Sequence, residues 1–179
     1  MATAEQRPHL NIRPARGDDA PALRDIFNDA VEEGFATFDS SLRSIEEQKR
    51  LIAMAEEDSR RPLFVAELRN YVCGLVSVES HEERVHGGEI GEVKVFVRRS
   101  FRSYGIGRQL LLVAQTEAAK LGYRKLIGRV LSDNEESLRL CKITGWRVVG
   151  IHEQHARHGN RLRDVTVVEY LLPAVPKVE

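Results

Sequence analysis

A short loop rich in glycine and arginine carries the strongest chemical signal in the sequence. It runs from Arg102 to Arg108, with glycines at positions 105 and 107, and an apolar segment follows it. Glycine lets a backbone turn tightly and approach a ligand, and the unpaired N–H groups at the start of a following helix attract anions. The loop therefore predicts a seat for phosphate groups, flanked by the charges of Arg102 and Arg108. A glycine-rich turn that only enters a helix is the alternative.

The loop matches neither of two common nucleotide-binding motifs. No Gly-Lys-Ser/Thr follows it, as a P-loop requires. The position three residues after Gly107 is Leu110 rather than the last glycine of a dinucleotide-binding fingerprint. Both of those motifs are therefore excluded.

Three histidines near the C-terminus raise the question of a metal site. His152, His155 and His158 recur every third residue. The segment His152-Glu153-Gln154-His155 is one residue short of the HExxH motif that places two imidazoles on one metal. The stretch from His152 to Arg163 is rich in Arg, Asn and Gly, which favours an exposed hairpin loop. We expect no metal site.

The elements that must position these residues follow from apolar periodicity and capping signals. Strands are predicted at 9–14, 63–68, 71–78, 89–97, 123–130, 146–151 and 165–172. Helices are predicted from Asp18 to Gly34, from the capping box at Ser44 onward, and over 105–120 and 134–143. Hairpins join the strands of the first half and helices join those of the second, so we expect a mixed sheet covered by helices.

Composition excludes several classes of partner. Of the 179 residues, 27 are Lys or Arg and 27 are Asp or Glu, so no net field attracts nucleic acid or an anionic membrane. The longest strongly apolar run, 110–114, is far too short to span a bilayer. The start of the chain has no secretory apolar core, and Cys73 and Cys141 form no CxxC pair. We expect one domain over 1–179, with a core of about 9–173, in the cytoplasm.

Two segments resemble the cofactor-binding segments of a known superfamily. The first runs from Val95 to Gly107 and contains Arg-x-x-Gly-x-Gly. The second contains Asn134, Ser137, Leu140, Gly145 and Trp146. Together they resemble the acetyl-CoA motifs of the GNAT N-acetyltransferases, in the expected element order and over nearly the whole chain. The resemblance implies the GNAT fold, an α/β structure with a mixed, mostly antiparallel twisted sheet of about seven strands flanked by about four helices.

Within the superfamily, the chain is most similar to the phosphinothricin and methionine sulfoximine acetyltransferases. The residues that carry this narrower resemblance are Ala36-Thr37-Phe38-Asp39, Glu92, Asn134, Ser137, Gly145, Gly159 and Asp164. It implies acetyl transfer from acetyl-CoA to the primary amine of a small molecule, an amino acid or an analogue, and permits a homodimer. Two alternatives stay open, namely acetylation of a protein N-terminus or lysine, and a non-catalytic module that binds acyl-CoA.

The resemblance places the catalytic base at Glu92. Because an ammonium group cannot attack a thioester, a nearby group must remove its proton. Glu92 lies with Lys94 and Phe96 on one face of its predicted strand, and Val93, Val95 and Val97 lie on the other. An exposed acid paired with Lys94 is the alternative, and Glu89 is a weaker candidate on the opposite face.

The same resemblance assigns the cofactor contacts. It implies that the main chain of the segment Val95-Phe96-Val97 pairs with the pantetheine arm as if the arm were another strand. The pyrophosphate would be held by Arg102, Ser103, Tyr104, Gly105, Ile106, Gly107 and Arg108. Asn134 would cap the following helix and hydrogen-bond the cofactor, with capping alone as the alternative, and Ser137 would contact the cofactor.

The chain departs from the family at Cys141, where many members have tyrosine or histidine. A thiol has a reference pKa of about 8.5 and can protonate a departing thiolate. Cysteine is also among the residue types most often buried, so a packing role is equally open.

Substrate contacts are expected on the early helices and on three loops, at 35–39, 81–88 and 152–163. Phe38 is a candidate apolar wall over the acceptor. Arg84, or an arginine within 157–163, is a candidate for binding a substrate carboxylate through a bidentate pair. His86, a further candidate for a substrate contact, stands where the phosphinothricin group usually has an aromatic residue. The substrate is therefore less firmly implied than the reaction.

Overall fold

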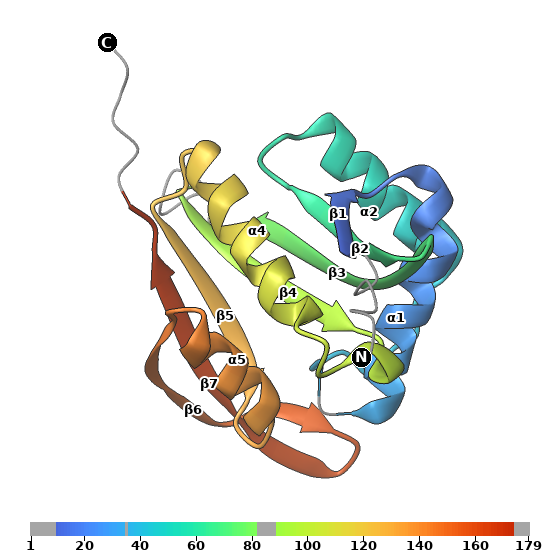
Figure 1. Cartoon of the computed structure of the whole chain (residues 1–179). Helices are drawn as coiled ribbons and strands as arrows, with labels where there is room; N and C mark the ends of the chain where they lie inside the picture. Colours follow the sequence, from blue (N-terminus) through green and yellow to red (C-terminus); the bar gives the residue numbers. More distant parts are fainter. Residues whose placement is uncertain (1–9, 35, 82–88, 174–179) are drawn as a thin grey trace, which may run out of the picture.

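A single seven-stranded sheet organises the protein, with strands in the order β1-β2-β3-β4-β5-β7-β6 (Figure 1). The computed structural model describes residues 10–34, 36–81 and 89–173. The strands are β1 (Leu10–Pro14), β2 (Leu63–Leu68), β3 (Tyr71–Ser80), β4 (Ile90–Val97), β5 (Lys125–Leu131), β6 (Arg147–His158) and β7 (Arg161–Leu171). Within these ranges the helices are α1 (Ala20–Glu33), α2 (Ile45–Glu57), α4 (Ile106–Lys120) and α5 (Glu135–Ile143). The predicted mixed sheet with flanking helices is confirmed.

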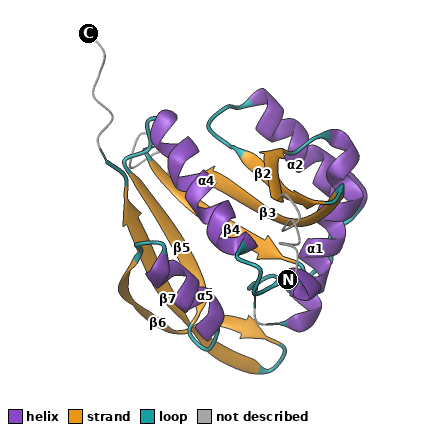
Figure 2. Ribbon diagram, in the orientation of Figure 1, coloured by secondary structure: helices purple, strands orange, loops and turns teal. Residues whose placement is uncertain are grey.

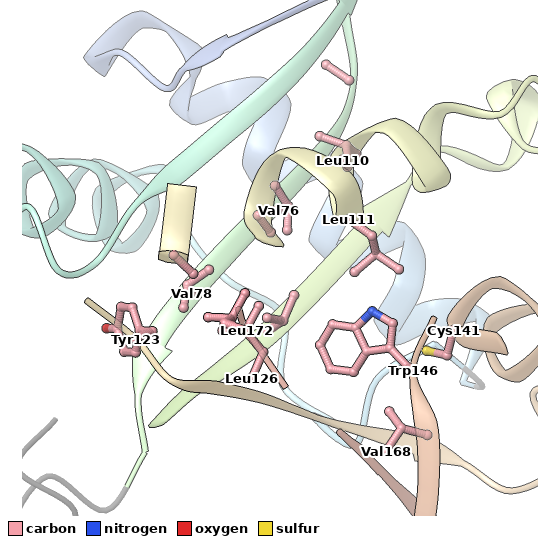
Figure 3. Packing of buried hydrophobic residues seen from close by; sticks show 14 of the residues in the cluster. Val76, Val78, Leu110, Leu111, Tyr123, Leu126, Cys141, Trp146, Val168 and Leu172 are labelled. Carbon is pink, nitrogen blue, oxygen red and sulfur yellow. The ribbon is translucent and has the colours of Figure 1, made fainter. Parts of the chain in front are cut away.

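Helices cover both faces of the sheet (Figure 2). On one face, Leu23 and Ile26 of α1 and Ile52 of α2 pack with Val65 and Leu75 of the sheet. On the other face, α4 and α5 pack onto β3, β4, β5 and β7. Figure 3 shows part of this second core, including Leu110, Leu111, Leu126, Cys141, Trp146 and Val168. No helix within the described ranges has both the length and the apolar character needed to cross a membrane.

The one parallel pairing in the sheet is short. β4 pairs with β5 only from Ile90 opposite Lys125 to Glu92 opposite Ile127. Beyond Glu92, β4 continues along β3 as far as Val97, while β5 continues along β7 as far as Leu131. The two strands therefore separate in the middle of the sheet, and the β5 side of β4 is left without a strand partner from Val93 onward (Figure 1).

Alternation along β4 places its side chains as predicted. Val93 is buried in the core beneath α4, and Val95 and Val97 pack against the same core. Phe96 points to the opposite face, where its ring meets Phe27 of α1 edge to face at 5.6 Å between centroids. Glu92 therefore lies on the α1 side of the sheet, because side chains alternate along a strand.

The stretch 152–163 is not the loop predicted from its composition. β6 extends to His158 and β7 begins at Arg161, with Ala156 opposite Arg163 and His158 opposite Arg161. Only a two-residue turn separates the strands. The predicted exposure and hairpin are confirmed, but the strand was missed because β6 is the edge of the sheet and is largely exposed. An exposed strand needs no alternating apolar residues, so its polar sequence is indistinguishable from that of a loop.

Candidate active site

Two adjoining cavities occupy the place where β4 and β5 separate. The first, here called the inner cavity, has a volume of about 200 Å³, and the second, the loop groove, about 460 Å³. They share the wall residues Ala36, Val95, Phe96, Asn134, Ser137 and Leu140. The inner cavity is lined by Glu92 and Arg129 from the α1 side and by Val93 and Trp146 from the other. It therefore passes through the opening in the sheet and connects its two faces.

The loop groove gathers most of the residues predicted to hold a pyrophosphate. Its lining includes Arg102, Ser103, Gly105, Ile106, Gly107 and Arg108, whereas Tyr104 is 75 % exposed and does not line it. Gly105 is the N-cap of α4 and has φ +79°, a left-handed conformation that favours glycine. A Cβ built on Gly105 would meet no atom within 4 Å, so it would project into open space. The first-turn amides of α4 lie beside this groove, where a helix offers unpaired donors.

Among the described residues, three arginines line the loop groove, and they differ in exposure and in hydrogen bonding. Arg102 donates from Nη2 to Glu33 at 2.7 Å and from Nε to the Val97 carbonyl at 3.2 Å. Arg108 and Arg139 both line the groove and are exposed. Sequence reasoning missed Arg139, which lies on α5. Its signal was helical spacing, because positions 136, 139, 140 and 143 share a helix face and all line the groove.

Gly107, two residues after Gly105, lies close to α5. A Cβ at this position would come within 3.0 Å of the Leu140 side chain on α5. A larger residue at position 107 would therefore press on Leu140, so glycine eases the close packing of α4 against α5. This packing closes one wall of the groove and brings the loop towards Asn134 and Ser137.

Glu92 is fixed by two partners on the α1 side of the opening. Its Oε1 accepts from Arg129, at 2.9 Å from Nε and 2.8 Å from Nη2. Its Oε2 lies 3.6 Å from Nδ1 of His81. The side chain is 13 % exposed, so this carboxylate is half-enclosed at the cavity wall.

The two alternatives for Glu92 have different outcomes. Lys94 pairs with Glu79 at 3.2 Å, and Glu92 pairs with Arg129, so the alternative of a Glu92–Lys94 pair is wrong. Glu89 pairs with Arg124 at 3.0 Å and lines neither cavity. Of the two candidate bases, Glu92 and Glu89, only Glu92 lines the inner cavity.

Phe38 lines the inner cavity, near Arg129. It packs against Leu131, Ala156 and Val165. Its ring centroid lies 5.9 Å from the guanidinium carbon of Arg129. Arg84 and His86, the other predicted substrate residues, lie outside the described residues.

The arginines of the last hairpin do not converge on the inner cavity. Arg163 donates to the Gly34 carbonyl and to Asp133, which ties the end of α1 to the segment before α5. None of the arginines of 157–163, all of which are described, lines that cavity. The carboxylate-binding role considered for them has no geometric support.

Cys141 lies on the wall of the inner cavity and is buried. Burial raises the pKa of its thiol to about 11. The group is therefore a neutral thiol at pH 7 and a weak proton donor. Beside it, Trp146 has a buried indole N–H that finds no hydrogen-bond partner among the described residues.

Asn134 lies at the junction of the two cavities and is buried. Its Oδ1 accepts from the Ser137 backbone N–H at 3.0 Å, so the predicted capping of α5 is confirmed. Any contact with a cofactor is an additional role that this capping leaves room for.

Two of the three histidines of β6 lie side by side. The rings of His152 and His155 stack at 4.8 Å between centroids. In the part of the chain that the structure describes, no group of three or more His, Cys, Asp or Glu side chains is arranged to hold a metal.

Comparison with known proteins identifies the family. Residues 12–167 match the acetyltransferase (GNAT) domain, and the chain belongs to this family of N-acetyltransferases. The L-methionine sulfoximine/L-methionine sulfone acetyltransferase of Salmonella typhimurium is 26 % identical over 91 % of this chain and 95 % of its own length. The predicted resemblance to that group is therefore confirmed.

Two solved structures extend the comparison. A ribosomal-protein-alanine N-acetyltransferase from Brucella melitensis is 29 % identical, with a TM-score of 0.86, over 90 % of this chain and 99 % of that one. A phosphinothricin acetyltransferase from Sinorhizobium meliloti, in complex with acetyl-CoA, shares the fold with a TM-score of 0.86 at 21 % identity, over 91 % of this chain and 88 % of that one.

Proposed function

We propose that this N-acetyltransferase moves the acetyl group of acetyl-CoA to the primary amine of a small molecule, an amino acid or an analogue. One observation carries the proposal. The opening between β4 and β5 joins a groove suited to phosphates on one face of the sheet to a half-enclosed carboxylate on the other. A donor and an acceptor approaching from opposite faces would meet inside it.

The residues around the loop groove fit the cofactor. The first-turn amides of α4 and the exposed Arg108 and Arg139 suit its phosphates. The unpaired side of β4 from Val93 to Val97 suits the amides of the pantetheine arm, because an extended chain can add to an open strand edge. Arg102 already occupies the Val97 carbonyl, so its role is to shape the loop and fix that end of β4. Acetyl-CoA supplies an activated acetyl thioester.

Glu92 acts as the general base on the acceptor side. Its carboxylate takes a proton from the acceptor ammonium, directly or through one water, and so creates the nucleophilic amine. His81, 3.6 Å from Oε2 and partly exposed, then provides a path for that proton towards solvent. A backbone N–H of β4 that faces the opening donates to the thioester oxygen, where negative charge develops during attack.

A protein N-terminus is the second candidate acceptor. The 29 % identity to a ribosomal-protein-alanine N-acetyltransferase favours it, whereas an inner cavity of only about 200 Å³ favours a small molecule. Free CoA release with amino acids, L-methionine sulfone, phosphinothricin and short alanyl peptides separates the two. Activity confined to the peptides would replace the small-molecule proposal.

The Glu92→Gln variant tests the mechanism. We expect kcat at pH 7 to fall about 10²- to 10⁴-fold, the range usual for loss of a general base. The affinity for CoA, measured by calorimetry, should stay within about threefold of wild type, because Glu92 does not line the loop groove. Glu89→Gln is the matched control and should leave both quantities unchanged. Undiminished turnover in Glu92→Gln would remove Glu92 from the mechanism, and tight CoA binding without turnover in wild type would indicate a non-catalytic module.

A further inference from the structure

Arg129 lines the inner cavity beside Glu92, the proposed base, and forms an ion pair with it at 2.8 Å. It lies on β5, two residues beyond the last β4–β5 pair, where the strands have separated. Its side chain is 38 % exposed and lines the inner cavity. The sequence had suggested other candidates for a carboxylate-binding cation, namely Arg84 or an arginine within 157–163.

The guanidinium of Arg129 has unused donor capacity. It carries five N–H donors in a planar fork, and Nε and Nη2 both point to the same oxygen, Oε1 of Glu92. Within 10–34, 36–81 and 89–173 it forms no other hydrogen bond or ion pair. Its only further contact of note is the distant face of Phe38. Donors therefore remain for a ligand in the cavity.

Lys94, the second cation among the described lining residues, is differently placed. Its Nζ pairs with Glu79 on β3 at 3.2 Å. A lysine also presents a point charge rather than a planar fork that matches a carboxylate. Arg129 is therefore the better candidate for recognising an anionic group beside Glu92.

The Arg129–Glu92 pair presents a positive and a negative group side by side. A free α-amino acid presents the opposite arrangement, an ammonium and a carboxylate attached to one carbon atom. We propose that Arg129 binds the acceptor's α-carboxylate while Glu92 holds its ammonium, so that the preferred acceptors are free α-amino acids and their analogues. This inference rests on the proposed function and adds the residue that selects the acceptor.

The arrangement also links recognition to catalysis. In the structure, Arg129 occupies the Oε1 atom of Glu92. A substrate carboxylate competes with Glu92 for the guanidinium, since bidentate arginine–carboxylate pairs are strong and geometrically specific. Oε1 then becomes available to the ammonium. An amine that lacks a carboxylate leaves the Arg129–Glu92 pair intact and is acetylated less efficiently.

The test compares each amino acid substrate with its α-carboxamide, which keeps the amine and removes the negative charge. The amino acids are the proteinogenic set, L-methionine sulfone and phosphinothricin, and the most active of them is carried forward. Wild type should prefer the acid over the amide by at least about tenfold in kcat/KM. In Arg129→Gln, kcat/KM for the acid should fall about 10- to 100-fold, as expected for a lost charge-assisted pair, and that for the amide by less than about threefold.

Two further variants sharpen the result. Arg124→Gln removes an arginine that also pairs with a glutamate, Glu89, but lies outside both cavities, and it should change neither substrate. Arg129→Lys keeps the charge without the fork and should recover only part of the preference. Calorimetry with CoA should give wild-type affinity for all variants, which verifies that they are folded.

Each outcome has a distinct meaning. Equal losses on acid and amide in Arg129→Gln would mean that Arg129 only positions Glu92, and the inference would be wrong. A wild-type enzyme that acetylates amines without preferring a carboxylate would overturn the inference while leaving the proposed reaction in place. Absence of acetyl transfer to every small amine would instead overturn the proposed function itself.

Discussion

Cys141 shows how burial decides the chemistry that one residue can perform. It stands where many relatives are expected to have a tyrosine or histidine, and it lines the inner cavity. Burial raises the pKa of its thiol to about 11, above the reference value of about 8.5 for a thiol. Proton transfer from such a group to a departing thiolate of ordinary pKa is uphill by about 3 kcal/mol. The packing role is therefore the better supported of the two hypotheses.

A Cys141→Ala variant should accordingly remain active. We expect kcat to stay within about threefold of wild type, because no proton transfer depends on the thiol, with a modest loss of stability from the removed packing. Steady-state CoA release measures this, and Cys73→Ala, which removes a buried cysteine that lines neither cavity, is the control. A fall of 10²-fold or more, with CoA affinity unchanged, would restore Cys141 as the general acid.

At the scale of elements, the turn into α4 places at Gly105 both a left-handed backbone and a position on the wall of the loop groove. Its φ of +79° disfavours any other residue, and it lines the loop groove. Gly122 has φ +82°, and a Cβ there would also meet nothing within 4 Å, but it lies outside the groove. A substitution at either glycine strains the backbone, but only a substitution at Gly105 adds an atom on the wall of the loop groove.

Gly105→Ala and Gly122→Ala should both lower the free energy of unfolding, by about 1–2 kcal/mol, because both place a Cβ in the left-handed region. Only Gly105→Ala should weaken CoA binding, by about tenfold or more, since its Cβ enters the groove. Urea denaturation and calorimetry with CoA measure the two effects. Equal CoA affinities in the two variants would contradict a phosphate seat at this turn.

For the molecule as a whole, buried ionisable groups predict a loss of stability at high pH. Burial raises the pKa values of Cys141, Cys73 and Tyr123 in the folded protein. In the unfolded chain these groups lose their protons at their ordinary pKa values, so deprotonation favours unfolding. The contribution of each is complete below its unfolded pKa and is lost as the pH rises through its folded pKa.

For Cys141 this window runs from about 8.5 to about 11, and the loss amounts to roughly 3 kcal/mol. Urea denaturation from pH 7 to 11 should therefore give a nearly constant free energy of unfolding up to about pH 8.5 and a decline above it. The decline should be smaller in Cys141→Ala, which lacks the titrating group. A free energy that stays level or rises over this interval would show that the thiol is not shielded as the fold implies.

Sequence reasoning was strongest where the signal is local. The capping box at Ser44 is present, with Glu47 N–H donating to Ser44 Oγ at 3.2 Å and Ser44 N–H to Glu47 Oε2 at 2.7 Å. The alternation that separates Glu92 from Val93 is present on β4. Both depend on residues a few positions apart, whose geometry the backbone of one helix or strand fixes.

Prediction from sequence failed where the surroundings of a strand, rather than its own residues, decide its length or its contacts. The length of β6 was missed because an exposed edge strand carries no apolar alternation. Arg129 was missed because an arginine on a strand gives no sign of which carboxylate it will meet. Its partner Glu92 is 37 positions away in the chain and belongs to a different strand.

The helices, most of the strands, the glycine turn before α4 and the resemblance to the acetyltransferases could be inferred from the residues alone, since these depend on local propensity and short motifs. The point where β4 and β5 separate, and the charges that face the resulting opening, became visible only in the folded chain. The reason is that strand pairing and register between distant segments are set by the packing of both sheet faces. The arrangement of Arg129, Glu92 and the loop groove around one opening is a property of that packing.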